Sequence, residues 1–404
     1  MVVLLLVGVL PVPAAYAKKE VQITYWHGWG GDEKKVVEDI VAKFNAEHPN
    51  IEVVPVTVFG SYDKLLTAIA AGTAPDVTSS VWWYQVPDLA SRGALTDLTS
   101  FARSSGVKAS DYVRPVWESW HYKGKLYAMG SIANYSMIAY NKDLFKQAGL
   151  DPEKAPKTVA ELDSYASKLW QVEGNRILRV GYYPSDLNTA SQMFRGKIFD
   201  GQKVTVTSPQ VIQAANWMRS YYDKYGYQAI QAFIASQGNY ASAANPFLSG
   251  QMAMQDNWGE WIVNFKKWYA PNLNYGRFPY PTVDGSPGFA NWGSSVWVLP
   301  TGSKHPKEAW EFIRWISSKE GSKLLALGIT NASVRLDLNA SPEFLKAMPT
   351  LSAALPLLRE GRLSVYPAFP GVDEFLQKLG NIMDTVYSGQ TTAEKALADL
   401  QKQY

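Results

Sequence analysis

The segment Val21–Asp32, VQITYWHGWGGD, constrains the fold of this chain more than any other stretch. Val21, Ile23 and Tyr25 alternate with polar residues, which is the period of a half-buried strand. Two tryptophans and three glycines follow, and the apolar residues after them recur at helical spacing. A strand, a turn and a helix in this order predict an open α/β sheet, in which ligands bind beyond the carboxyl ends of the strands.

The turn itself can be interpreted in two ways. Its tryptophans either pack inward or stack on the apolar face of a sugar, for which flat rings beside flexible glycines are well suited. A dinucleotide site is excluded, because the G-x-G-x-x-G pattern begun by Gly28 and Gly30 has Glu33 at its third position. We expect Asp32 to cap the helix that follows.

Composition excludes several classes of function. The 39 basic and 36 acidic residues leave a net charge of +3, which gives no electrostatic case for binding nucleic acid. Cysteine is absent and the four histidines are scattered, so we expect no disulfide, no metal site and no cofactor. The 15 tryptophans, 23 tyrosines and 15 phenylalanines can fill a core, but they are also the side chains that stack on sugars.

The N-terminus predicts export. An apolar run, Met1–Val12, precedes an A-x-A pattern, Ala15–Ala17, which is typical of a signal-peptide cleavage site. As a helix this run would reach only about 18 Å, whereas a bilayer core is about 30 Å thick. We therefore expect residues 1–17 to be a signal peptide and the mature chain to begin near Lys18. No Lys or Arg precedes the apolar run, so the true start can lie upstream.

The next segments continue the α/β pattern. A β-rich run at Ile51–Phe59, a helical segment and a short strand ending at Asp76 complete a strand–helix–strand–helix–strand series, which predicts a mostly parallel sheet. The long β-like stretch Leu126–Asn141 is continuous enough to run from one lobe into another. Ser208 and Pro209 open a later helix, with proline at its first position.

Six segments, taken together and in order, resemble the extracellular solute-binding proteins of ABC importers, a family with maltose-, multiple-sugar- and glycerol-phosphate-binding members. They are FNAEHPNIEV, LLTAIAAGTAPDV, MIAYNKDLFKQAGLDPEKAPKT, FLSGQMAMQDNW, GSSVWVLP with HPKEAWEFIRWISS, and YSGQTTAEKALADL. The resemblance covers most of the mature chain.

The resemblance implies a type II periplasmic binding protein fold, in which two α/β lobes are joined by crossover strands and ligand is held in the cleft between them. By this analogy, residues 18–132 and 273–327 form the N-terminal lobe. Residues 133–272 and 328–404 form the C-terminal lobe.

The resemblance also implies a set of cleft residues. They are Trp26, His27, Gly28 and Trp29 in the first turn, Asp76, Trp82 and Trp83 after the third strand, Asn134 and Tyr135 at the crossover, Asp256, Trp258 and Trp261 in the C-terminal lobe, Trp292, Gly293 and Ser294 before the late strand, and Arg335.

Some of these residues have alternative roles that the sequence leaves open. Asp76 can cap the turn after its strand, and Arg335 can pair with a cleft carboxylate instead of ligand. Trp258 stands in a polar segment, which favours exposure to the cleft. Trp292 replaces one of the paired glycines usual in the family, which suggests an aromatic contact there.

The expected function is that of a non-catalytic, monomeric periplasmic receptor that closes around a carbohydrate, such as a di- or oligosaccharide, and docks on a membrane permease. One alternative keeps the fold and binds a glycerol-phosphate ligand, but the sequence has no cluster of Arg and Lys that must meet a phosphate. Another is a secreted glycosidase with two carboxylates about 5 to 10 Å apart, for which no acidic pair has a suitable context.

Overall fold

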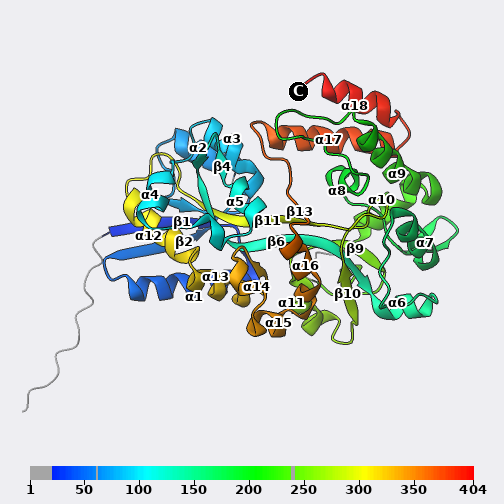
Figure 1. Cartoon of the computed structure of the whole chain (residues 1–404), viewed down its shortest axis with the longest axis horizontal. Helices are drawn as coiled ribbons and strands as arrows, with labels where there is room; N and C mark the ends of the chain where they lie inside the picture. The colour runs from blue at the N-terminus through cyan, green and yellow to red at the C-terminus, as the bar shows by residue number, and fades with distance from the viewer. Residues whose placement is uncertain (1–20, 61, 238–241) are drawn as a thin grey trace, which may run out of the picture.

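The computed structural model describes residues 21–60, 62–237 and 242–404, and its two lobes lie side by side along the long axis of the molecule (Figure 1). The expected signal peptide, residues 1–17, lies outside the described residues. Two long strands, β6 (Ala128–Asn141) and β11 (Ala290–Val298), connect the lobes. At these two places the chain passes between the lobes through paired strands.

The remaining elements follow in chain order. Before β6 come β1 (Val21–His27), α1 (Gly31–Glu47), β2 (Ile51–Thr57), α2 (Tyr62–Ala70), β3 (Val77–Thr78), η1 (Trp83–Gln85), α3 (Val86–Ser91), α4 (Thr99–Ser104), η2 (Ala109–Asp111), α5 (Arg114–Ser119), β4 (His121–Tyr122) and β5 (Lys125–Leu126). Between β6 and β11 come α6 (Lys142–Gln147), α7 (Val159–Leu169), β7 (Gln171–Glu173), β8 (Arg176–Arg179), α8 (Leu187–Met193), α9 (Pro209–Tyr225), α10 (Tyr227–Ser236), β9 (Met254–Trp258), α11 (Trp261–Tyr269) and β10 (Tyr275–Phe278). After β11 come α12 (Pro306–Ile316), α13 (Lys319–Gly328), β12 (Ala332–Ser333), α14 (Leu336–Asn339), α15 (Pro342–Ala347), η3 (Pro349–Ala353), α16 (Leu355–Glu360), β13 (Leu363–Ser364), α17 (Val372–Tyr387) and α18 (Ala393–Gln401).

One mixed sheet runs through both lobes. Its main path has the order β10-β6-β11-β3-β1-β2. Strand β1 pairs in parallel with both β2 and β3, with Tyr25 opposite Pro55 on one side and Val77 on the other. The expected parallel pattern therefore holds at this end of the sheet. The crossing strands differ, because β6 pairs antiparallel with β9, β10, β11 and β12.

The first βα unit forms where its sequence pattern predicted, with one difference at the helix start. Strand β1 alternates buried and exposed residues, and α1 buries the apolar stripe of Val37, Ile40, Val41 and Phe44. The N-cap is Gly30, which offers no capping side chain, so the expectation that Asp32 caps the helix is wrong. Asp32 lies in the first turn instead, where the positive end of the helix dipole stabilises its negative charge.

Hydrophobic residues gather in two large cores, one on each side of the crossing region, and we name the lobes by these cores. Phe44, Trp297 and Phe312 belong to the core of the first lobe, whereas Tyr182 and Phe375 belong to that of the second. We expected residues 328–404 to lie together in the C-terminal lobe. Their packing divides them, because α14, α15 and α16 contribute to the first core while α17 and α18 contribute to the second.

Candidate functional site

The carboxyl ends of β1, β2 and β3 meet at one edge of the first lobe. Parallel strands bring their carboxyl ends to the same edge, where open α/β sheets bind ligands. The loops that leave this edge enclose a cavity of about 440 Å³. Its lining residues are Gly28, Trp29, Phe59, Gly60, Tyr62, Asp63, Ser79, Ser80, Val81, Trp82, Gln85 and Ser295.

Aromatic side chains form much of the wall of this cavity. Trp29 stacks on the buried Trp297, with ring centroids 5.7 Å apart. Phe59 packs over Gly30, where a Cβ atom would stand 3.1 Å from the phenyl ring. Trp82 is 50 % exposed and Phe59 is 57 % exposed, which is unusual for such large apolar side chains. The cavity therefore offers aromatic faces that the described part of the chain leaves partly exposed.

Next to the cavity, four aromatic residues that belong to the first core or pack against it contact one another. The ring centroid of Trp83, in the first lobe, lies 6.1 Å from that of Trp258, the last residue of β9. The ring centroid of Tyr366 lies 5.8 Å from that of Trp258 and 6.0 Å from that of Tyr84. These four rings form one aromatic cluster of the first lobe. Trp258, which stands in a polar segment of the sequence, thus ends a strand and packs against the first core.

The crossing strands separate the expected residues onto two faces. Gly293 lies directly under the ring of Trp83, and its strand partner Asn134 donates to Ser295 of the cavity wall at 3.4 Å. Successive residues of a strand point to opposite faces, so Tyr135 and Trp292 lie on the other side. Both are fully buried and stack on each other with centroids 5.2 Å apart.

The face that carries Tyr135 holds a buried polar network instead of a cavity. Arg277, with a fully buried side chain, donates to Glu260 at 2.9 Å and lies over the ring of Tyr135 at 4.3 Å. The hydroxyl of Tyr135 also donates to Glu260. Buried Ser294, on the same face, accepts from the indole of Trp120 at 2.9 Å. In this structure Tyr135 and Ser294 therefore form hydrogen bonds with other protein side chains.

Three expected residues near the first turn either lie in β1 or are hydrogen-bonded to it. Asp76 is 8 % exposed and accepts from the Thr24 backbone at 2.9 Å and from Ser303 at 2.7 Å. His27 is fully buried beside Trp29, and burial lowers its pKa below the ordinary value. Trp26 is partly buried in β1 and is not among the lining residues. Of the first turn, only Gly28 and Trp29 reach the cavity.

Asp256 contacts the second lobe, whereas Trp261 packs against a smaller third cluster of buried residues. The Asp256 carboxylate accepts from the hydroxyl of Tyr182 at 3.0 Å and from the backbone N–H of Ser185 at 3.1 Å. Burial raises the pKa of Asp256 to about 6. Trp261 begins α11, three residues beyond Trp258, and packs at 6.0 Å from Phe265. Neither residue lines the cavity.

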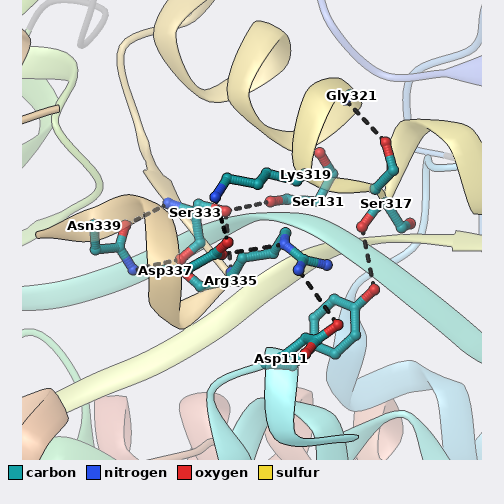
Figure 2. A network of polar contacts seen from close by, with 11 residues as sticks. Asp111, Ser131, Ser317, Lys319, Gly321, Ser333, Arg335, Asp337 and Asn339 are labelled. Carbon is teal, nitrogen blue, oxygen red and sulfur yellow. Dashed lines mark hydrogen bonds and ion pairs between the residues drawn. The ribbon is translucent and has the colours of Figure 1, made fainter. Parts of the chain in front are cut away.

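Arg335 lies in a polar network beside β12, the short strand that pairs with β6 (Figure 2). Its guanidinium pairs with Asp111 and Asp337, each at 3.3 Å, and lies 5.3 Å from the ring centroid of Tyr112. Its two partners, Asp111 and Asp337, do not line the cavity, so a pair with a cleft carboxylate and a contact with ligand both stay predictions. The side chain is only 12 % exposed.

Several lining residues were not predicted. Phe59 and Gly60 follow β2, and Ser79 and Ser80 follow β3, so both pairs lie at the edge that the first turn had already marked. Applying the rule for strand carboxyl ends to β2 as well as to β1 would have found the first pair. Ser295 could not be found in this way, because it comes from β11 and reaches the cavity only through tertiary pairing.

A second space, of about 770 Å³, lies between α5, the α8 region and the segment that leads to α17. Its lining residues include Pro87, Pro115, Glu118, His121, Asn188, Gln192, Arg195, Lys197, Phe199, Phe289 and the range 363–368. It contains none of the residues expected from the sequence. It also lies away from the carboxyl ends of β1, β2 and β3, so we take the first cavity as the candidate site.

Two lobes joined by crossing strands, with an aromatic cavity beside their contact, define the class of two-lobed binding proteins. None of the helices in the described part of the chain combines the length and the apolar character that crossing a membrane requires. The chain belongs to the bacterial extracellular solute-binding protein family, whose model matches residues 39–352.

Individual relatives agree with this assignment. The structure of CpMnBP1 with mannotriose bound is 31 % identical, has a TM-score of 0.85, and the match covers 95 % of this chain and 99 % of that one. The structure of maltose-bound MalE3 of T. maritima is 21 % identical and has a TM-score of 0.78, and the match covers 95 % of this chain and 98 % of that one. It shares the type II fold. The sn-glycerol-3-phosphate-binding periplasmic protein UgpB of Escherichia coli (strain K12) is 26 % identical, over 93 % of this chain and 90 % of UgpB.

Proposed function

We propose that this chain is the substrate-binding receptor of an ABC importer and that it binds an uncharged di- or oligosaccharide at the cavity beyond β1, β2 and β3. The observation that supports this most is the combination of aromatic faces with polar groups in one wall. Trp29, Phe59 and Trp82 can stack on the C–H faces of sugar rings, and the serine and glutamine side chains there can bond hydroxyl groups. The relative that binds mannotriose and mannobiose supports the same ligand class.

The proposed receptor works without catalysis. It acts outside the cytoplasmic membrane, in the periplasm, as a monomer that delivers its ligand to the permease subunits. Its lobes move about β6 and β11, so that ligand shifts an equilibrium between open and closed arrangements. The 16 residues expected from the sequence stay candidates for ligand contact. Gly28, Trp29 and Trp82 are the strongest among them, because they line the cavity.

A glycerol-phosphate ligand is the alternative, and the UgpB relatives favour it. A phosphate is usually bound by cationic side chains or by backbone N–H groups. Among the described residues that line the cavity, Asp63 is the only one with a charged side chain. This acidic residue supports an uncharged ligand over a phosphorylated one.

Tryptophan fluorescence tests the proposal. The mature protein is titrated with mannobiose, mannotriose, maltose and sn-glycerol 3-phosphate, and the emission is followed to saturation. We expect a saturable change with an uncharged oligosaccharide, and we expect Trp82→Ala to weaken that binding at least tenfold. A response to sn-glycerol 3-phosphate alone would favour the alternative. Equal affinities of the wild type and Trp82→Ala for the sugar would place the ligand elsewhere.

A further inference from the structure

Helix α17 of the second lobe begins against the first lobe. Its N-cap residue, Gly371, has a φ of +83° and no side chain with which to cap the helix. The backbone N–H of Gly371 donates instead to Oδ1 of Asp88, at 2.8 Å, in α3 of the first lobe. The Asp88 side chain is only 3 % exposed, and a carboxylate is favourable at the positive end of a helix. The first lobe thus supplies the cap for a helix of the second.

A second hydrogen bond joins the lobes at the same place. Nε2 of Gln85 donates to Oδ2 of Asp373, at 2.9 Å, in the first turn of α17. Oε1 of the same amide accepts from the backbone N–H of Trp82 at 2.8 Å, so both ends of the Gln85 amide are held. Burial, together with the carboxylates of Asp88 and Asp63, raises the pKa of Asp373. Gln85 is therefore the group that ties this carboxyl to the first lobe.

Both contacts start from the wall of the candidate site. Tyr62 and Gln85 line the cavity. The hydroxyl of Tyr62 donates to Asp88, and the amide of Gln85 donates to Asp373. A ligand that fills the cavity is thus separated from the carboxylate of Asp88 by the side chain of Tyr62. It is separated from the carboxylate of Asp373 by the side chain of Gln85.

We propose that Tyr62, Gln85, Asp88, Gly371 and Asp373 form an interlobe latch through which occupancy of the cavity controls closure of the lobes. A ligand that fixes Tyr62 and Gln85 holds in place the groups to which α17 binds, so it stabilises the closed arrangement. Asp88 and Asp373 are positioning residues, because they do not line the cavity. The identity of the ligand rests on the proposed function, whereas the hydrogen bonds of the latch do not.

The latch makes affinity depend on residues outside the cavity. Apparent affinity falls in proportion to the fraction of molecules in the binding-competent arrangement. Removing the latch therefore weakens binding although every lining side chain is kept. Arg92 also pairs with Asp88, at 3.1 Å, but its side chain is 52 % exposed and both residues belong to the first lobe. That ion pair does not join the lobes.

Distances between spin labels can test the latch in the full-length mature protein. The chain holds no cysteine, so Asp39→Cys on α1 and Asp399→Cys on α18 place one label on each lobe. Both side chains are exposed, by 66 % and 50 %. The latch variant is Asp88→Ala with Asp373→Ala. Its control is Asp384→Ala, which removes a carboxylate of α17 that accepts from Tyr227 within the second lobe.

We expect the latch variant to lengthen the interlobe distance without ligand and to raise the Kd for mannotriose about tenfold. Saturating mannotriose should restore the short distance, and the control should match the wild type in both measurements. The milder Asp88→Asn, which keeps an acceptor for Gly371, should lie between them. A latch variant with the distance and Kd of the control would overturn the proposal. If no sugar binds the wild type, the proposed function fails, whereas the ligand-free distances still decide whether the latch holds the lobes together.

Discussion

The indole of Trp83 lies so close to Gly293 that a Cβ atom at residue 293 would stand 2.2 Å from Cζ2 of the ring. Trp83 begins η1, which follows β3, and Gly293 belongs to the crossing strand β11. The absence of a side chain on the strand therefore lets an aromatic ring of the first lobe rest on the crossing region, beside Trp258. This contact fixes the wall of the candidate site relative to the crossing strands.

The first prediction follows from this contact. Gly293→Ala should force the Trp83 ring off the strand, at a cost of about 1–3 kcal/mol in the free energy of unfolding, because an overpacked core must shift. Urea unfolding and the near-ultraviolet circular dichroism of the tryptophans measure the change. Gly380→Ala is the control, since a Cβ there meets nothing within 4 Å and the residue lies within α17. Equal stability of Gly293→Ala and the wild type would contradict the packing.

Charge selectivity gives a second prediction. Asp63 is the only charged side chain among the described lining residues, so a cation at this position should attract anionic ligands. Asp63→Lys should raise the affinity for sn-glycerol 3-phosphate about tenfold, and added salt should remove the gain. Calorimetric titration at two salt concentrations measures this effect. Asp39→Lys, on the exposed surface of α1, is the charge-matched control and should not gain affinity.

A third prediction concerns the buried ion pair beneath the crossing strands. Arg277→Met should lower the free energy of unfolding by about 3–5 kcal/mol, because Glu260 would remain buried without its cation. The control is Arg114→Met, whose pair with Glu118 is exposed on both sides and is worth under about 1 kcal/mol. Chemical denaturation of both variants provides the comparison. Similar losses in the two would mean that the buried pair contributes no more than a surface pair.

The pH dependence of stability gives a fourth prediction. The pKa of Asp256 in the folded protein, about 6, lies above its ordinary value, so the native state holds the proton more tightly than the unfolded chain. Its contribution to stability is therefore present below about pH 4 and is lost as the pH rises to about 6. The stability of the wild type relative to Asp256→Asn should fall by about 2–3 kcal/mol over this range. Urea unfolding of both proteins at each pH tests this, and parallel curves would contradict it.

Local patterns predicted much of the chain correctly. The first strand, the helix behind it and the long strand through Asn134 form where their periodicities placed them. Gly28 and Trp29 line the cavity because they follow the carboxyl end of a parallel strand. The end of that strand can be recognised in the sequence alone. The turn chemistry did not reveal that Gly30, rather than Asp32, would be the N-cap, since both residue types are acceptable there.

The sequence by itself determined which segments become strands and helices, because hydrophobic period and turn residues act over a few neighbouring positions. Only the tertiary structure decided which side of the crossing strands each residue faces. Asn134 donates to Ser295 of the cavity wall while Tyr135 lies in the buried network behind it, and one step along a strand separates the two. The contact of Asp88 with Gly371 joins residues 283 positions apart. Such a contact has no local signature, because it depends on how the two lobes pack against each other.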